Sequence, residues 1–278
     1  MFEARFEEDG SVAAPRLTPP SADGHKYDRG HAFILSGPRH RTGAARLAAM
    51  ACLRVGAGLV TLVGEAAALD EHAAQVAAIM LREDDGVCAF IDDRTGALAM
   101  GPGLGAGERT RAKVLDWLDK GFPAVLDADA LTSFAGDPDT LFAALRDDVV
   151  LTPHAGEFAR LFPDIAMDDR KSAVCVAAER SGAVVLLKGA QTHIADPTGR
   201  HAVNRHASPW LATAGAGDVL TGMIAGLLSQ HLLAFDAAAV AAWLHGDAGM
   251  RGGAGLVADD LPGLIVGTLQ DLSGDIAE

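Results

Sequence analysis

Short apolar runs alternate with segments of helical periodicity along most of the chain. Runs of consecutive apolar residues are typical of strands buried on both faces of a sheet. They occupy residues 32–36, 58–63, 97–105 (ending in a glycine-rich loop), 124–126, 149–152 and 183–188. Apolar residues at helical spacing fill residues 44–54, 66–80, 108–120, 168–181, 219–229, 235–250 and 258–272. This alternation predicts an α/β fold, with helices on both faces of a largely parallel central sheet.

Two segments depart from the alternation. The polar run 191–205 contains the turn sequence Asp196-Pro197-Thr198-Gly199, which predicts a β-hairpin. Residues 1–24 carry acids, three prolines and no apolar period, so we expect a poorly ordered or extended leader. The rest, 25–278, contains no linker or repeat and is predicted to be a single domain.

The composition excludes several classes of protein. A net charge of −14 argues against a nucleic-acid partner, which would need a basic surface. The chain has no signal-peptide pattern at its start and no apolar run long enough to span a membrane. Cys52, Cys88 and Cys175 are far apart and lack metal-binding spacing, so a reducing cytoplasm is the simplest setting.

The stretch 212–229, ATAGAGDVLTGMIAGLLS, is the strongest candidate for chemistry. Small residues followed by an amphipathic helix predict a bare helix N-terminus, whose N–H groups and dipole attract phosphate. Asp218 would stand beside that phosphate, where a carboxylate is best explained as a base that activates an attacking hydroxyl. The alternative is a glycine-rich cap in which Asp218 only complements the helix dipole.

Other candidates follow predicted strands, where open α/β sheets bind ligands. Asp127 and Asp129 follow one strand, although an N-cap role is favoured for Asp129. His154 and Glu157 open a helix and share a face, so both can point into one cleft, unless Glu157 only complements the helix dipole. Lys188 ends an apolar strand and needs an anion, either a nucleotide phosphate or a nearby carboxylate.

Two loops are candidates for contact with a ligand. The loop GPRHRTGA, residues 37–44, is basic and suits a phosphorylated ligand, although an ordinary solvated loop explains it equally well. The loop that ends AMGPGLG at Gly105 is rich in glycine, which lets backbone approach a ligand closely. Its spacing is not that of a dinucleotide-binding fingerprint, so a Rossmann fold is disfavoured.

Several stretches together carry a family resemblance. ATAGAGDVLTG resembles the anion-hole and catalytic-Asp motif of the ribokinase-like superfamily, which transfers phosphoryl groups to small-molecule hydroxyls. Further stretches in the same order are CLRVGAGLVTL, AMGPGLG, AVLDADAL, LTPHAGEFARLF and VVLLKGAQT. Over nearly all of residues 25–272 the chain is similar to the NAD(P)H-hydrate dehydratase family, which implies a ribokinase-like three-layer α/β/α fold.

The resemblance also implies roles for matching positions. Asp218 matches the catalytic residue, and Glu157 matches a glutamate near magnesium, held through water; His154 stands where the superfamily usually has Asn. The positions that match substrate contacts are Ala44, Gly103, Gly105, His154 and Asp218. Those that match nucleotide contacts are Lys188, Gly189, Ala190, Gln191, Thr192 and Gly217, and those of the anion hole are Ala214, Gly215, Ala216 and Gly217.

The implied reaction is the ADP- or ATP-dependent dehydration of the S form of NAD(P)H hydrate, with Mg²⁺ as cofactor. The hydroxyl on the damaged ring is phosphorylated, and phosphate then leaves to restore NADH or NADPH. Bacterial members generally use ADP. The resemblance further implies a homo-oligomer, with a tetramer favoured.

Two departures from the family pattern bear on this interpretation. AGAGD replaces the common GGTGD, although the superfamily's kinases often read GAGD. The 24 residues before the domain cannot form the N-terminal epimerase domain of many members, so we expect a stand-alone enzyme or a fragment of a bifunctional chain. The alternatives are a small-molecule kinase acting on a vitamin-precursor alcohol, and a non-catalytic nucleotide-binding protein.

Overall fold

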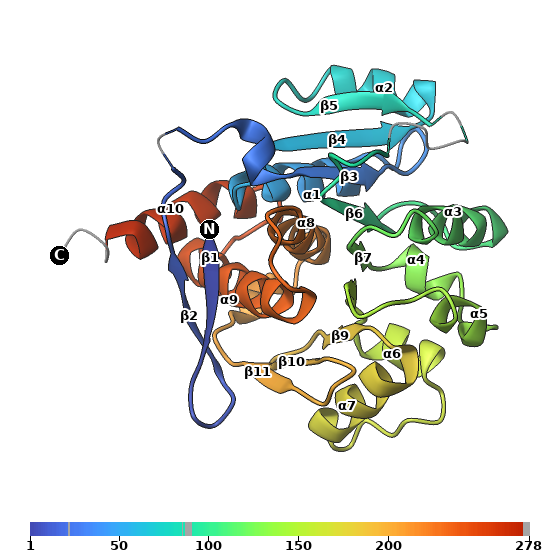
Figure 1. Cartoon of the computed structure of the whole chain (residues 1–278), viewed down its shortest axis with the longest axis vertical. Coiled ribbons are helices and arrows are strands. Elements are labelled where there is room, and N and C mark those ends of the chain that lie inside the picture. The colour runs from blue at the N-terminus through green and yellow to red at the C-terminus, as the bar shows by residue number, and fades with distance from the viewer. Residues whose placement is uncertain (22, 85, 87–90, 275–278) are drawn as a thin grey trace.

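The computed structural model describes residues 1–21, 23–84, 86 and 91–274. Within these residues, nine strands form one sheet in the order β11-β10-β9-β8-β7-β6-β3-β4-β5 (Figure 1). Its strands are β3 (His31–Leu35), β4 (Leu59–Gly64), β5 (Met80–Glu83), β6 (Ala97–Met100), β7 (Ala124–Leu126), β8 (Val149–Leu151), β9 (Val184–Leu187), β10 (Thr192–Ala195) and β11 (His201–Asn204). The strands from β5 to β9 are parallel, while β10 and β11 are antiparallel.

Helices cover both faces of the sheet, which confirms the predicted architecture (Figure 1). One face carries α1 (Gly43–Arg54), α8 (Ala216–Ser229), α9 (Ala234–Gly252) and α10 (Leu261–Gly274). The other face carries α3 (Glu108–Leu118), α4 (Asp129–Thr132), α5 (Pro138–Phe142), α6 (Ala155–Leu161) and α7 (Arg170–Ser181). The hairpin predicted over residues 191–205 is confirmed as β10 and β11, paired from Thr192 with Asn204 to Ala195 with His201.

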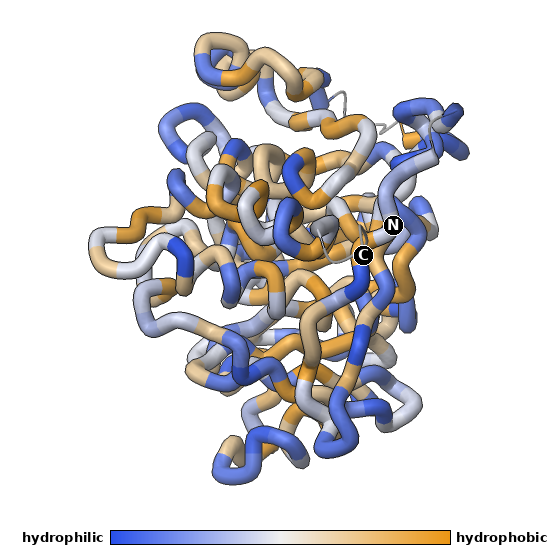
Figure 2. Tube along the Cα trace, turned by 90° about the vertical axis from the view of Figure 1, so that its left-hand side faces the viewer, coloured by the Kyte–Doolittle hydropathy of each residue, from blue (hydrophilic) through white to orange (hydrophobic). Residues whose placement is uncertain are grey.

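Each central strand contributes to two hydrophobic cores. In β3, Ala32 and Ile34 face the core under α8, whereas Phe33 and Leu35 face the core under α3 and α6. Such strands lack polar alternation because neither face meets water. Figure 2 shows hydrophobic residues gathered in the interior and hydrophilic residues at the outer loops.

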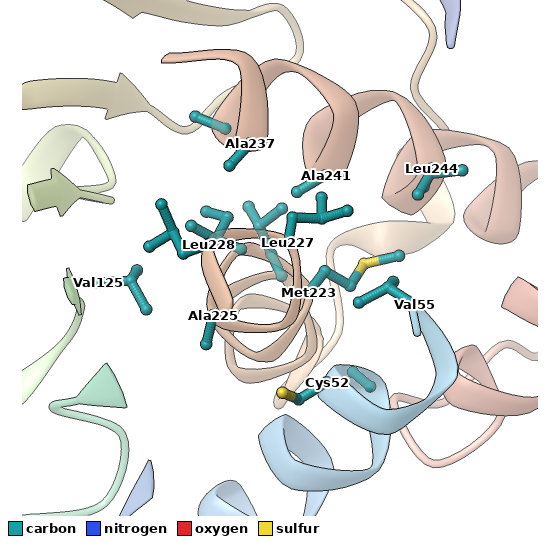
Figure 3. Packing of buried hydrophobic residues seen from close by; sticks show 14 of the residues in the cluster. Cys52, Val55, Val125, Met223, Ala225, Leu227, Leu228, Ala237, Ala241 and Leu244 are labelled. Carbon is teal, nitrogen blue, oxygen red and sulfur yellow. The ribbon is translucent and has the colours of Figure 1, made fainter. Parts of the chain in front are cut away.

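Helix α8 is the most enclosed helix of its face. Ala225, Leu227 and Leu228 are all 2 % exposed or less, and they lie between α9, α1 and the sheet (Figure 3). Against α1 the contact is at backbone distance, because a Cβ on Gly222 would lie 2.0 Å from the carbonyl oxygen of Ala48. Glycine at this position therefore sets the spacing between the two helices.

Of the two predicted states of the leader, poorly ordered or extended, residues 2–17 are extended: they form the antiparallel hairpin β1 (Phe2–Phe6) and β2 (Val12–Leu17), which is not poorly ordered chain. Phe2 and Val12 are buried, and the ring of Phe6 lies 5.8 Å from that of Phe235 on α9. In β1 apolar Phe2, Ala4 and Phe6 alternate with charged residues, a short period-2 pattern that was missed from the sequence, and Gly10 with φ +80° lies in the turn that follows. The hairpin thereby covers α9 with its apolar face.

The helix predicted over residues 66–80 is too long. The helix is α2 (Ala66–Ala73), and Met80 already belongs to β5, where it pairs with Thr61 of β4. Pairing with a free sheet edge overrides the local helical period of these residues. Of the cysteines, Cys52 and Cys175 are free thiols, and Cys88 lies outside the described residues. No helix in the described part of the chain is long and apolar enough to cross a membrane.

Candidate active site

The N-terminus of α8 lies at the carboxyl edge of the parallel strands, beside Lys188 at the end of β9. Gly215 has φ +91°, and a Cβ there would lie 2.8 Å from both Leu47 and Ala258, so only glycine fits. No side chain caps the helix; the N–H of Ala216 donates to the carbonyl of Thr213 at 3.4 Å, and the N–H groups of Gly217 and Asp218 have no acceptor among the described residues. The predicted bare helix N-terminus is therefore present.

Asp218 lies in the first turn of α8, partly buried. Burial, and to a smaller extent the charge of Asp127, raise the pKa of this carboxyl to about 6 against the opposing charge of Lys188. A carboxylate with a pKa near 6 is a stronger base than an ordinary aspartate, and it is still deprotonated at neutral pH. These properties suit a proton acceptor better than a helix cap.

The raised pKa predicts that Asp218 destabilises the folded chain at neutral pH. Its pKa is about 6 in the folded state against an ordinary 3.8. Below about pH 4 the carboxyl is protonated in both states, and the folded chain keeps its full free energy of unfolding. As the pH rises through about 6 the carboxyl must ionise in its buried site, and the free energy of unfolding falls. We expect Asp218→Asn to raise the free energy of unfolding by about 2 kcal/mol at about pH 7.5 and to leave it unchanged at about pH 3.5. Urea titrations at both pH values measure the difference, and a gain that persists in acid would contradict the prediction.

Asp127 connects three elements beneath Asp218. One oxygen accepts a hydrogen bond from Lys188 Nζ at 2.6 Å, and the other accepts from Thr221 Oγ1 of α8 at 2.9 Å. Of the two partners predicted for Lys188, a nucleotide phosphate or a nearby carboxylate, the structure shows the carboxylate, Asp127. The roles of Asp127 and Thr221 in this network were missed, although the position of Asp127 after a buried strand was a usable signal.

Asp129 is not an N-cap, contrary to the prediction. It is the first residue of α4, Ala128 precedes it with φ +49°, and its carboxylate accepts the N–H of Gly105 at 2.7 Å. The positive φ of Ala128 turns the chain between the two acids. Asp127 thus faces α8 while Asp129 holds the loop after β6.

His154 and Glu157 form a capping box at the start of α6. The Glu157 carboxylate accepts the N–H of His154 at 2.8 Å, and His154 Nδ1 accepts the N–H of Gly156 at 2.9 Å. Glu157 is also buried with one oxygen 3.9 Å from Lys188 Nζ, so it caps the helix and faces the lysine cluster at once. The His154 side chain is 54 % exposed.

A cavity of about 580 Å³ opens beside Lys188 and Gly217. The predicted nucleotide residues that line it are Lys188, Gly189, Ala190, Thr192 and Gly217, whereas Gln191 is exposed outside it. Of the predicted anion hole, Ala216 and Gly217 line the cavity, and Ala214 and Gly215 lie outside its lining. Much of its wall is apolar, as expected for a pocket that receives a nucleobase.

Two buried polar residues of this cavity were missed from the sequence. Asn204 donates from Nδ2 to the carbonyls of His206 and Ala242, which leaves its Oδ1 without a partner among the described residues. The Nε2 of His245 likewise has no partner there, and burial lowers the pKa of this ring to about 4, so it is neutral. Neither residue lies in a motif that the sequence singles out.

The predicted substrate residues Ala44, Gly103 and Gly105 lie together, where the loop after β6 meets the start of α1. A Cβ on Gly103 would lie 3.5 Å from that of Ala44 and 2.7 Å from the carbonyl oxygen of Arg41. Gly103 and Gly105 have positive φ, so glycine allows this close approach. His154 follows β8, and β7 separates that strand from β6, so His154 flanks the acids rather than the glycines.

The chain is similar to known proteins over this whole framework. A family model described as NAD(P)H-hydrate dehydratase matches residues 32–267. The bifunctional NAD(P)H-hydrate repair enzyme Nnr of Synechocystis is 40% identical over 238 residues, which are 81% of this chain and 45% of that protein. The Nnr enzyme of Moorella thermoacetica is 38% identical over 94% of this chain and 53% of its own length.

A solved structure agrees with these sequence matches. The ADP/ATP-dependent NAD(P)H-hydrate dehydratase from Bacillus subtilis, co-crystallized with ATP/Mg²⁺, matches with a TM-score of 0.80 and 29% identity, covering 92% of this chain and 95% of that one. The chain spans about half the length of the curated relatives it matches. Its sequence and its ribokinase-like fold show that the chain belongs to the NAD(P)H-hydrate dehydratase family.

Proposed function

We propose that this protein dehydrates the S form of NAD(P)H hydrate with ADP or ATP as phosphoryl donor, which repairs a damaged nicotinamide dinucleotide. The observation that carries the proposal is the position of Asp218. This basic carboxylate lies in the first turn of α8, whose Ala216 and Gly217 line the 580 Å³ cavity, and Gly215 just before it packs on Leu47 of α1, the helix that the Ala44 loop enters. Phosphoryl transfer needs the acceptor hydroxyl within reach of both the donor phosphorus and a base.

Asp218 takes the proton from the hydroxyl of the hydrate as its oxygen bonds to the terminal phosphorus of the nucleotide. The bond from that phosphorus to the bridging oxygen breaks, and ADP leaves as AMP, or ATP as ADP. Lys188 and the uncovered N–H groups of α8 stabilise the charge on the transferring oxygens. Phosphate then leaves the ring carbon with the C–O electron pair, and loss of a neighbouring proton forms the double bond of the dihydropyridine.

The residues present fit a magnesium ion that is held mainly by the nucleotide. The described residues contain no cluster of three or more metal-ligating side chains. Mg²⁺ at phosphate sites commonly keeps water ligands and uses one or two carboxylates. We propose that Glu157 holds it through water, since this carboxylate is buried beside Lys188. When bound, the ion would neutralise charge on the nucleotide phosphates.

We propose a homo-oligomer, with a tetramer favoured, in the cytoplasm. Exposed apolar side chains on several elements, including Trp210, Leu233 and Met250, offer surface that a second copy would cover. The free thiols of Cys52 and Cys175 suit a reducing compartment. Light scattering of the purified protein tests the oligomeric state, and a monomer at micromolar concentration would exclude it.

An absorbance assay on separated hydrate forms tests the proposed function. We expect the purified chain with Mg²⁺ and ADP or ATP to restore the nicotinamide absorbance of the S form, while the R form and the reaction without nucleotide stay unchanged. Mass spectrometry of the products adds a second readout. A stable phosphorylated alcohol formed without any dinucleotide would instead support the small-molecule kinase. Binding of nucleotide without turnover of either substrate would support a non-catalytic protein.

A further inference from the structure

The place of the acceptor substrate follows from the direction of phosphoryl transfer, given the proposed function. The nucleotide cavity opens on the side of Lys188 and Gly217, beyond β9 and β10. The attacking and leaving oxygens lie roughly in line at phosphorus, so the acceptor must approach the phosphorus from the side opposite the leaving nucleotide. The loop after β6, with Gly103 and Gly105, and the loop that enters α1 lie outside the lining of the nucleotide cavity, so we assign the acceptor to them.

Negative charges near the acceptor side repel the dinucleotide substrate. A dinucleotide carries at least two negative charges on its pyrophosphate, and it must approach the acids Asp127, Asp129 and Asp218 in a chain of net charge −14. Lys188 is already paired with Asp127. The dinucleotide therefore needs a cation on its own side of Asp218.

Most cations near this edge are already neutralised. In the loop 37–44, Arg39 Nε lies 3.4 Å and His40 Nδ1 3.3 Å from Glu71 Oε1. On the next elements, Arg109 pairs with Glu65, and Lys113 pairs with Asp84 at 2.8 Å. Glu71 therefore offsets the charge of Arg39, one of the residues that make the loop look basic in the sequence.

Arg41 is the exception in this loop. Among the described residues no carboxylate lies within 4 Å of its guanidinium, and the side chain is exposed. Its Nη1 lies 3.2 Å from the place of a Cβ on Gly105, and its carbonyl oxygen lies 2.7 Å from that of a Cβ on Gly103. The guanidinium therefore stands over the glycine loop, and its donors have no partner among the residues that the structure describes.

We propose that Arg41 binds a phosphate of the dinucleotide substrate and so contributes to substrate recognition. A guanidinium offers two parallel N–H groups that match phosphate oxygens. Arg41 does not touch the reacting hydroxyl, so its contribution is to binding and not to the chemical step. Two phosphates fit this chemistry: the pyrophosphate, shared by NADH and NADPH hydrates, and the 2′-phosphate of the NADPH form.

Substitution of Arg41 tests the proposal, with Arg39 as the matched control. We expect Arg41→Gln to raise the KM for hydrate roughly 10- to 100-fold, with kcat and the KM for ADP little changed. Arg41→Lys should recover part of the loss. Arg39→Gln, in the same loop but paired with Glu71, should leave the KM unchanged. Both hydrates are assayed, and titration with NADH and NADPH gives binding constants without turnover.

The possible outcomes distinguish a failure of the Arg41 proposal from a failure of the proposed reaction. Equal losses with both hydrates support contact with the pyrophosphate, and a loss confined to NADPH hydrate supports contact with the 2′-phosphate. An unchanged KM in Arg41→Gln, an equal rise in Arg39→Gln, or a fall in kcat alone would overturn the proposal. If the wild-type chain dehydrates neither hydrate, the proposed function fails, and weaker binding of NADPH or NADH by Arg41→Gln alone still decides the role of Arg41.

Discussion

Asp218→Asn is expected to lower kcat for dehydration about 1,000-fold, since a positioned general base contributes roughly 10²- to 10⁴-fold. The amide keeps the size of the carboxylate but cannot accept the proton of the attacking hydroxyl. The KM for ADP should stay within about threefold, because the cavity walls and Lys188 are unchanged. Steady-state assays with S hydrate measure both constants.

A second aspartate in the first turn of a helix provides the control. Asp236 occupies that position in α9, where it pairs with Arg200 at 3.0 Å and lies outside the lining of the nucleotide cavity. Asp236→Asn also removes a negative charge that interacts favourably with a helix dipole, but it removes no base. The kcat of this variant should therefore match that of the wild type. Equal kcat values for Asp218→Asn and wild type would show that Asp218 only complements the helix dipole and is not the base.

Gly222→Ala should lower the free energy of unfolding by about 3 kcal/mol, despite the better helix propensity of alanine. The added methyl would lie 2.0 Å from the carbonyl oxygen of Ala48 and 2.5 Å from its carbonyl carbon. Backbone atoms cannot turn aside as a side chain can, so α1 and α8 must move apart. Urea unfolding at neutral pH measures the change.

Gly263→Ala is the matched control for this substitution. Gly263 is also helical, in α10, but a Cβ there meets no atom within 4 Å. We expect its stability to stay unchanged or to rise by up to about 1 kcal/mol. A Gly222→Ala variant as stable as Gly263→Ala would show that the helices tolerate a wider spacing.

Local patterns predict the buried strands well and the edge elements poorly. The runs that became β3, β4, β7, β8 and β9 are recognisable because both faces are buried, which leaves no polar alternation. The strand β5 begins at Met80, which is 43 % exposed, and its residues resemble the end of a helix. Its pairing with β4, like the packing of the first hairpin on α9, depends on contacts that are distant in sequence.

The candidate site shows the same limit at the level of single residues. Asp127 and Asp129 are two positions apart, and only the backbone turn at Ala128 decides which one meets Lys188. The loop 37–44 looks uniformly basic, but Glu71 on α2 lies beside Arg39 and His40, while Arg41 has no carboxylate partner in the described part of the chain. Motif resemblance predicts which segments form the site, whereas the partners of their side chains are seen only in the folded structure.

The glycine contact between α1 and α8 also bears on how the site can move. Contacts advance together along both helices, from Gly215 against Leu47 to Gly226 against Cys52 and Val55, so the helices run in the same direction. This packing holds the loop 37–44 at the start of α1 and Asp218 at the start of α8 at a fixed spacing. Lys188 is tied to the same unit, because Asp127 accepts hydrogen bonds from both Lys188 and Thr221 of α8.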